Sequence, residues 1–128
     1  MDFKTDKPIY KQIIDLCFAR IISGEWPPGA KLPSVREMSI ELAVNARTVL
    51  SAFDELQDSE IIFSQRGIGY FLSPDAPHKV REARKADFFD SKLVTLLQEM
   101  DALHISVDQV AEALYRLKSE NKETLYKQ

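Results

Sequence analysis

Before residue 60, apolar residues are spaced three and four positions apart in three separate stretches. This spacing predicts three amphipathic helices, each with one face turned toward a core. The first begins at Pro8, because a residue without an amide hydrogen costs nothing in the first turn, and it ends at Gly24. The second runs from Ser34 to about Leu42, since Ser34 followed three positions later by a glutamate forms a capping box.

A third helix is predicted over residues 46–59, after a tight turn. Asn45 precedes it and is a residue type that caps the N-termini of helices. Val49, Phe53 and Leu56 are four and three positions apart, so these side chains are expected to face the core. The opposite side of this helix is therefore left for solvent or for a partner.

Two stretches rich in β-branched and aromatic residues, 61–63 and 68–72, predict the strands of a β-hairpin. Residues 65–67 contain a glycine and supply the turn between them. Residues 30–32 favour a further short strand. The two prolines within residues 73–77 end the second strand and predict a linker. The linker divides the chain into a first domain and a C-terminal part.

The C-terminal part, residues 76–128, shows a helical pattern of its own. Apolar residues spaced 4, 3, 4 and 3 positions apart form a heptad seam from Phe89 to Leu103. A capping box at Ser106 begins another helix, and the pattern is lost from Glu120, where we expect the chain to fray. A very short connector joins the two helices, which predicts an antiparallel helical hairpin.

A single helical hairpin has little core of its own, so another surface must cover its apolar stripe. A second copy of the chain is the simplest cover, because twofold symmetry makes the patch self-complementary. The C-terminal part is therefore predicted to be the dimerisation domain of a homodimer. The predicted dimerisation residues are Phe89, Leu93, Leu96, Met100, Leu103, Val110, Leu114 and Leu117.

The predicted fold class is mainly α with a small β-hairpin (α+β). It is a winged helix-turn-helix in residues 1–75, followed by a two-helix dimerisation tail in residues 76–128. In this arrangement two short helices joined by a tight turn hold the second helix outward, so that its first residues enter the major groove of DNA. The hairpin is the wing, which contacts phosphates or the minor groove. The pattern thus predicts double-stranded DNA as a partner.

Residues 8–72 also carry a set of short motifs. These are P-I-Y-x-Q-I, G-x-x-x-P-G-x-x-L-P-S-x-R, V-N-x-x-T-V and G-x-G-x-F, in this order. Together they resemble the DNA-binding domain of GntR-type bacterial transcription regulators, and the short two-helix tail resembles the YtrA-like subgroup, whose tails pair the subunits. The resemblance implies a sequence-specific regulator, by family a repressor, that acts as a homodimer on an inverted-repeat operator.

The resemblance also implies which residues contact DNA. In the family, an arginine at the start of the second helix binds DNA at the edge of the groove. Three residues at the start of the third helix, the recognition helix, contact DNA, and the backbone of the wing tip approaches it closely. The predicted DNA-binding residues are Ser34, Arg36, Asn45, Arg47, Thr48, Arg66 and Gly67. Many relatives outside the subgroup have arginine where this chain has Ala46 and Leu50, so the familiar operator sequence is not carried over.

The chain has 17 lysine and arginine residues against 20 aspartate and glutamate residues, a net charge of −3. DNA binding therefore has to depend on where a few cations lie and not on a bulk basic excess. Lys31, Arg36, Arg47 and Arg66 would converge on one face of a winged helix, and a dimer would double them. The acidic balance leaves one alternative open, a winged-helix module that binds a protein and has no sequence-specific DNA binding.

Other functions lack the residues they need. One cysteine excludes an internal disulfide framework, and two histidines cannot form a multi-histidine metal site. No apolar stretch reaches the roughly 18–20 residues that span a bilayer, and no signal-peptide pattern begins the chain, so we expect a cytoplasmic protein without a membrane partner. No catalytic motif or phosphate-cradling loop is present, which predicts neither an enzyme nor a cofactor. The sequence leaves open whether a small-molecule effector binds at the dimer interface or beside it.

Overall fold

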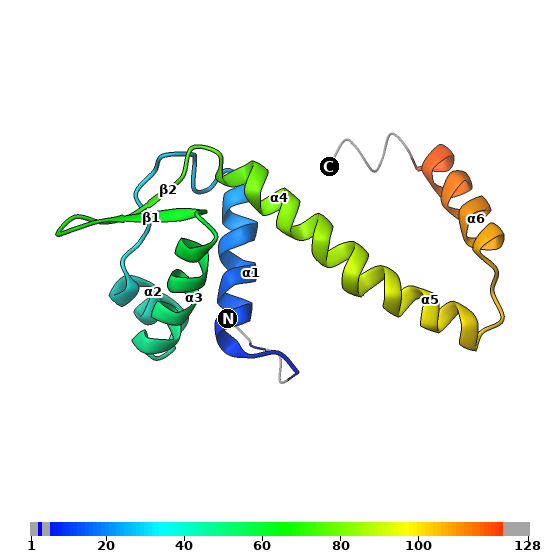
Figure 1. The fold of residues 1–128 in the computed structure, drawn as a ribbon, viewed down its shortest axis with the longest axis horizontal. Helices are drawn as coiled ribbons and strands as arrows, with labels where there is room; N and C mark the ends of the chain where they lie inside the picture. The colour runs from blue at the N-terminus through cyan, green and yellow to red at the C-terminus, as the bar shows by residue number, and fades with distance from the viewer. Residues whose placement is uncertain (1–2, 4–5, 122–128) are drawn as a thin grey trace. The chain divides into compact units, whose positions relative to one another are not determined.

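The computed structural model describes residue 3 and residues 6–121. The chain divides into two compact units, residues 1–85 and residues 86–128, here called the N-terminal and the C-terminal unit. Figure 1 shows helices α1 to α3 and the hairpin β1–β2 in the N-terminal unit, and helices α5 and α6 in the C-terminal unit. The winged helix-turn-helix architecture that the sequence predicts is confirmed.

The three predicted helices of the N-terminal unit are α1 (Ile9–Ile22), α2 (Val35–Leu42) and α3 (Ala46–Asp58). Pro8 is the N-cap of α1, so it stands one position before the first helical residue and not within the first turn. The predicted capping box of α2 is present. The Ser34 hydroxyl accepts a hydrogen bond from the Glu37 amide at 3.0 Å.

The turn between α2 and α3 is tight because one non-glycine residue adopts a left-handed backbone conformation. Ala43 has a φ of 54°, and the amide of Val44 donates a hydrogen bond to the Ser39 carbonyl at 3.1 Å. This closes α2 within two residues and lets α3 begin directly after Asn45. The two helices pack against each other, and α3 also packs against α1.

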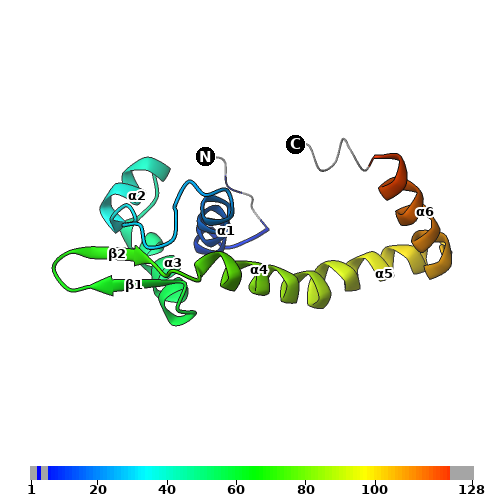
Figure 2. The same ribbon diagram turned by 90° about the horizontal axis from the view of Figure 1, so that it is seen from above.

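The wing is an antiparallel hairpin of β1 (Ile62–Gln65) and β2 (Gly69–Leu72). The first strand starts one residue later than predicted. Residues 30–32 pair with the free edge of β2, where the Leu32 amide donates to the Tyr70 carbonyl at 2.8 Å, so the predicted further strand is present as a short bridge. Figure 2 shows the end of the hairpin projecting beyond the helices of this unit.

The core of the N-terminal unit is formed by α1, α2, α3, the start of α4 and the inner side of the hairpin. Ile13 and Cys17 of α1 meet Phe53 of α3, and all three are fully buried. The Phe53 ring packs edge-on against the half-buried Tyr70 ring of β2, with 5.0 Å between ring centres. The hairpin is thereby held in place by α3.

The predicted linker at residues 73–77 and the boundary after residue 75 differ from the structure. Helix α4 (Ala76–Asp87) begins inside the linker, and Pro77 lies in its first turn, where proline fits. Ala76 and Val80 are fully buried in the core of the N-terminal unit, which therefore extends to residue 85. The buried apolar contacts, and not the prolines, decide where this unit ends.

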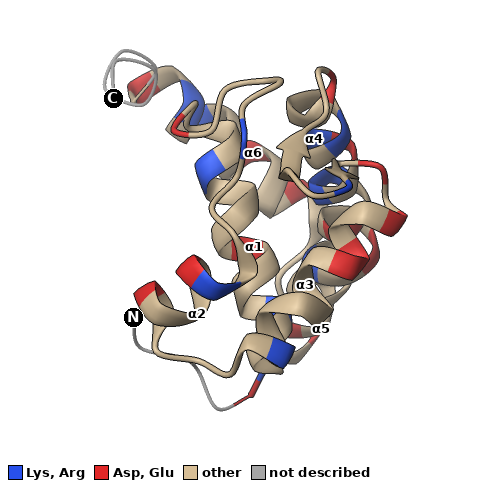
Figure 3. Cartoon of the chain, turned by 90° about the vertical axis from the view of Figure 1, so that its left-hand side faces the viewer, with Lys and Arg blue, Asp and Glu red and all other residues tan. Residues whose placement is uncertain are grey.

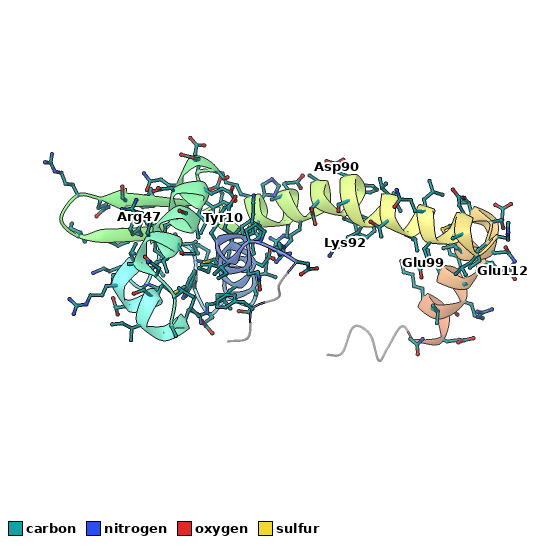
Figure 4. The ribbon with its side chains drawn as sticks, turned by 90° about the horizontal axis from the view of Figure 1, so that it is seen from below. Tyr10, Arg47, Asp90, Lys92, Glu99 and Glu112 are labelled. Carbon is teal, nitrogen blue, oxygen red and sulfur yellow. The ribbon has the colours of Figure 1, made fainter. Side chains whose placement is uncertain are left out.

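The C-terminal unit contains a π-helical turn, η1 (Phe88–Lys92), then α5 (Leu93–Ala102) and α6 (Val107–Glu120). Asp90 and Lys92 of η1 point to opposite sides of the helix in Figure 4. A π-turn holds one extra residue, so it interrupts the 3.5-residue repeat that the heptad seam requires. Fraying was predicted from Glu120, which is the last residue of α6, and residues 122–128 lie outside the described residues.

The connector between α5 and α6 is short, as predicted, and Ser106 caps α6 in a second capping box with Gln109. Figure 1 shows the two helices diverging from this connector, so they form an open V and not the predicted close antiparallel hairpin. Among the described residues of this unit, Met100 alone is buried.

Candidate nucleic-acid interface

The first turn of α3 is shaped by Asn45, the predicted cap. Its side-chain oxygen accepts a hydrogen bond from the Arg47 amide at 2.8 Å. Because α3 turns Val49 and Phe53 into the core, Arg47 is left exposed on the outer face (Figure 4). Thr48 is half-buried between the two faces, so only part of its side chain is accessible.

The first turn of α2 contributes Ser34 and Arg36, and both side chains are exposed. The capping box occupies the Ser34 hydroxyl as an acceptor, and the carboxylate of Glu37 accepts a hydrogen bond from the Ser34 amide at 3.1 Å. The hydrogen bond from the Ser34 amide, followed by a contribution from the Ser34 side chain, lowers the pKa of Glu37, so this carboxylate is held in its charged form at the helix N-terminus. Arg36 extends from the same turn.

The tip of the wing holds Arg66 and Gly67, both exposed. Gly67 has a φ of 78°, a conformation that glycine adopts without strain, and the turn closes through a hydrogen bond from the Ile68 amide to the Gln65 carbonyl at 2.9 Å. Lys31 belongs to the strand segment that pairs with β2, and this segment is counted as part of the wing from here on. Together these residues give the wing two cations, one at its tip and one along its edge.

Gly69 of β2 is required where it stands. It has a φ of 141°, and a β-carbon built on it would lie 3.1 Å from the Cε atom of Lys31. The absence of a side chain therefore lets the Lys31 side chain cross over the strand. A larger residue at this position would force the end of the lysine side chain to shift slightly and would strain the backbone of the hairpin.

The ion pairs of the N-terminal unit separate its cations into two groups. Lys7, Lys11, Arg20, Lys79, Arg84 and Lys85 each pair with a carboxylate of the fold. Among the described cations of this unit, those that make no ion pair with a described carboxylate are Lys31, Arg36, Arg47, Arg66 and Arg81. Four of these five belong to α2, α3 and the wing, which are the elements expected to meet DNA.

The acidic side chains of α3 lie toward its second half, away from Asn45 and Arg47. Glu55 is held by Lys11 of α1, with 3.1 Å between Nζ and Oε1, and this hydrogen bond raises the pKa of the lysine. Figure 3 shows the lysine and arginine residues as separate segments between acidic and neutral ones. The charge of the surface therefore depends on a few placed cations.

The single cysteine is not a reactive group in this fold. Burial raises the pKa of the Cys17 thiol to about 12, which leaves it protonated and unreactive at neutral pH. In the part of the chain that the structure describes, no three His, Cys, Asp or Glu side chains come together as metal ligands would. None of the helices described is long and apolar enough to cross a membrane.

The C-terminal unit has an apolar groove of about 450 Å³ between α5 and α6. Five of the eight predicted dimerisation residues line it: Leu93, Leu96, Met100, Val110 and Leu114. Phe89, Leu103 and Leu117 lie outside it and are exposed. Four lining residues, Val94, Leu97, Val107 and Ala111, were not among the predicted dimerisation residues, because the groove is wider than the seam positions alone.

Comparison with known proteins decides the family. Residues 9–72 match the family described as bacterial regulatory proteins, gntR family. The chain belongs to the GntR family. This range contains α1, α2, α3 and the wing, so the GntR match covers each of the seven predicted DNA-binding positions.

Two GntR relatives match most of this chain. The uncharacterized HTH-type transcriptional regulator YhcF of Bacillus subtilis is 33% identical over 112 residues, which cover 88% of this chain and 91% of YhcF. The HTH-type transcriptional repressor YtrA of Bacillus subtilis is 31% identical over 117 residues, covering 91% of this chain and 84% of YtrA. Both matches extend beyond the DNA-binding domain into the tail.

A solved structure of a GntR family transcriptional regulator from Listeria monocytogenes has a TM-score of 0.72 and 33% identity, covering 89% of this chain and 98% of that one. The resemblance to the GntR family and its YtrA-like subgroup is thus confirmed. This GntR protein is a DNA-binding transcriptional regulator with a winged helix and is not an enzyme.

Proposed function

We propose that this GntR protein is a repressor that acts as a homodimer on an inverted-repeat operator. Each N-terminal unit binds one half-site, and the C-terminal units pair the two subunits. The observation that supports this most is the set of cations that make no ion pair with a described carboxylate, Lys31, Arg36, Arg47 and Arg66, on α2, α3 and the wing. Except for Arg81, the other described arginines and lysines of this unit form ion pairs with carboxylates of the fold.

In this proposal the first turn of α3 enters the major groove. Arg47 contacts base edges there, and Asn45 and Thr48 contact the groove beside it. Arg36 and Ser34 bind the phosphates at the groove edge, where the N-terminus of α2 adds a favourable dipole. Arg66 and the backbone at Gly67 place the wing on the neighbouring phosphates or in the minor groove.

The proposed dimer follows from the apolar surface of the C-terminal unit. Leu97 is 48% exposed and Leu114 is 61% exposed, although both line the same groove. Such a surface is stable in water when an equivalent surface covers it, and twofold pairing of two identical V-shaped helix pairs provides that cover. A twofold dimer in turn requires half-sites related by the same symmetry, spaced by whole turns of DNA.

Repression is supported by the relative YtrA, which is named a transcriptional repressor. A dimer bound over a promoter blocks polymerase by occupying the same DNA, and this needs no activating surface. The site of action is the cytoplasm, where bacterial DNA lies.

The proposal is tested by selecting binding sites from random duplex DNA with the full chain, then measuring affinity in mobility-shift assays. We expect an enriched inverted repeat, and weaker binding by Arg47→Ala, equivalent to about 1–3 kcal/mol if Arg47 contacts a base. Arg116→Ala on α6 is the matched control and should bind as the wild type does. Failure to enrich any sequence would contradict the proposal and favour the alternative of a protein-binding module.

A further inference from the structure

The outer face of α3 carries one large apolar side chain. Leu50 is 41% exposed and does not belong to the core, which takes Val49 and Phe53 from the same helix. At 3.6 residues per turn, Leu50 stands four positions after Ala46 and three after Arg47, so it lies next to both on the helix surface. The base-reading candidate Arg47 therefore has an apolar neighbour one turn further along.

Few polar groups on this face are available to bases beside Leu50. The Ser51 hydroxyl donates a hydrogen bond to the Arg47 carbonyl at 3.1 Å, so its hydrogen is used within the helix. Ala46 is exposed and presents only a methyl group. On one side of Arg47, the first two turns of α3 thus offer DNA an apolar edge made of Ala46 and Leu50.

The major groove contains one apolar feature that distinguishes base pairs. Thymine carries a C5-methyl group there, whereas the other recognition features of the groove are hydrogen-bond donors and acceptors. A leucine side chain cannot form hydrogen bonds with those donors and acceptors. Packing it against the thymine methyl group removes apolar surface from water, which favours binding. A leucine at this position therefore favours a thymine and disfavours the polar edge of a guanine or a cytosine.

We propose that Leu50, with Ala46 beside it, is a specificity-determining residue that selects a thymine in each operator half-site, next to the base pair that Arg47 contacts. This rests on the proposed function, because α3 must enter the major groove for Leu50 to reach a base. The proposal makes Arg47 the polar reader and Leu50 the apolar reader of one recognition helix.

The test replaces thymines of the selected half-site, one at a time, by deoxyuridine, which keeps base pairing and lacks only the methyl group. At one position per half-site, wild-type affinity should fall roughly three- to tenfold. Leu50→Ala should bind the two duplexes within about a factor of two of each other, because the side chain that contacts the methyl is gone. Gln57→Ala, at an exposed position further along α3, is the control and should still distinguish them.

Site selection repeated with Leu50→Arg gives a second readout. We expect guanine to replace thymine at that position, with the rest of the half-site unchanged. Leu50 is outside the core, so thermal melting should confirm that all three variants are folded.

The outcomes separate this proposal from the proposed function. A selected operator that binds equally well with deoxyuridine at every position overturns the thymine proposal alone. Discrimination that persists undiminished in Leu50→Ala also overturns it, since another residue then contacts the methyl. Absence of sequence-specific binding by the wild-type chain overturns both proposals.

Discussion

The side-chain oxygen of Asn45 accepts a hydrogen bond from the backbone amide of Arg47 at 2.8 Å. This contact determines where α3 begins, because it satisfies one of the amides that the first turn leaves without a helical partner. It also places Arg47 in that first turn, on the face opposite Val49. Helix capping and the presentation of the proposed base-reading arginine thus depend on the same side chain.

Substitutions of Asn45 should separate these two roles. Asn45→Ala removes the cap and should lower the free energy of unfolding by about 1 kcal/mol. Asn45→Asp keeps an oxygen acceptor, so stability should stay near that of the wild type, but its negative charge should weaken DNA binding. Urea unfolding and mobility-shift assays measure the two effects. Wild-type DNA affinity in Asn45→Asp would exclude Asn45 from the interface.

The dependence of operator affinity on salt should reveal how many phosphates the dimer neutralises. If each subunit neutralises about four phosphates, with Lys31, Arg36 and Arg66 among the groups that do so, the slope of log affinity against log salt should be about −7. The measurement is a titration of affinity between low and physiological salt. A slope near zero would contradict the proposal that these cations bind DNA in a protein whose net charge is −3.

A charge placed in the apolar groove should separate the subunits. Leu97→Asp puts a carboxylate among the groove residues, so the chain should sediment as a monomer and bind the full operator more weakly. Gln98→Asp introduces the same residue at the next position, which is exposed and does not line the groove, and it should stay dimeric. Equal masses for the two variants in sedimentation would locate the interface elsewhere.

Cys17 should affect stability at alkaline pH and should not act as a reactive group. Burial raises its pKa to about 12 from an ordinary value of 9.0, so the native state disfavours the thiolate. The stability that the neutral thiol contributes is complete below pH 9 and is lost as the pH rises from about 9 toward 12. The free energy of unfolding of the wild type should therefore fall more steeply than that of Cys17→Ala over this range.

The same residue offers a direct labelling measurement. A thiol reagent at pH 8 should modify Cys17 slowly in the native protein and rapidly in urea, because the side chain is buried and protonated. Rapid labelling of the native protein would contradict both the burial and the raised pKa.

Much of the fold could be predicted because its signals are local. The residues Ser34 and Glu37, three positions apart, determine the start of α2, and Asn45 determines the start of α3. The same holds for Ser106 at the start of α6. Capping depends on side chains and amides within one turn, so the order of residues is enough to indicate it.

The features for which the structure differs from the expectation depend on contacts between residues far apart in the chain. Helix α4 continues the N-terminal unit past residue 75, because Ala76 and Val80 are buried against a core formed by earlier residues. The π-turn η1 interrupts the heptad seam, and nothing in the spacing of Phe89 and Leu93 indicated it. Val94 and Leu97 line the groove although they lie off the seam, because the angle between α5 and α6 decides which side chains face it.

The same distinction between local and long-range interactions applies to the candidate site. The sequence by itself determined which residues stand at the helix starts and at the wing tip, among them Arg36, Arg47 and Arg66. Only the tertiary structure decided which cations make no ion pair with a described carboxylate. Arg20 is held by Glu25 and Glu41, and Lys11 by Glu55, a partner 44 positions away. The physical reason is range: capping acts within one helical turn, whereas ion pairing and burial join residues that only folding brings together.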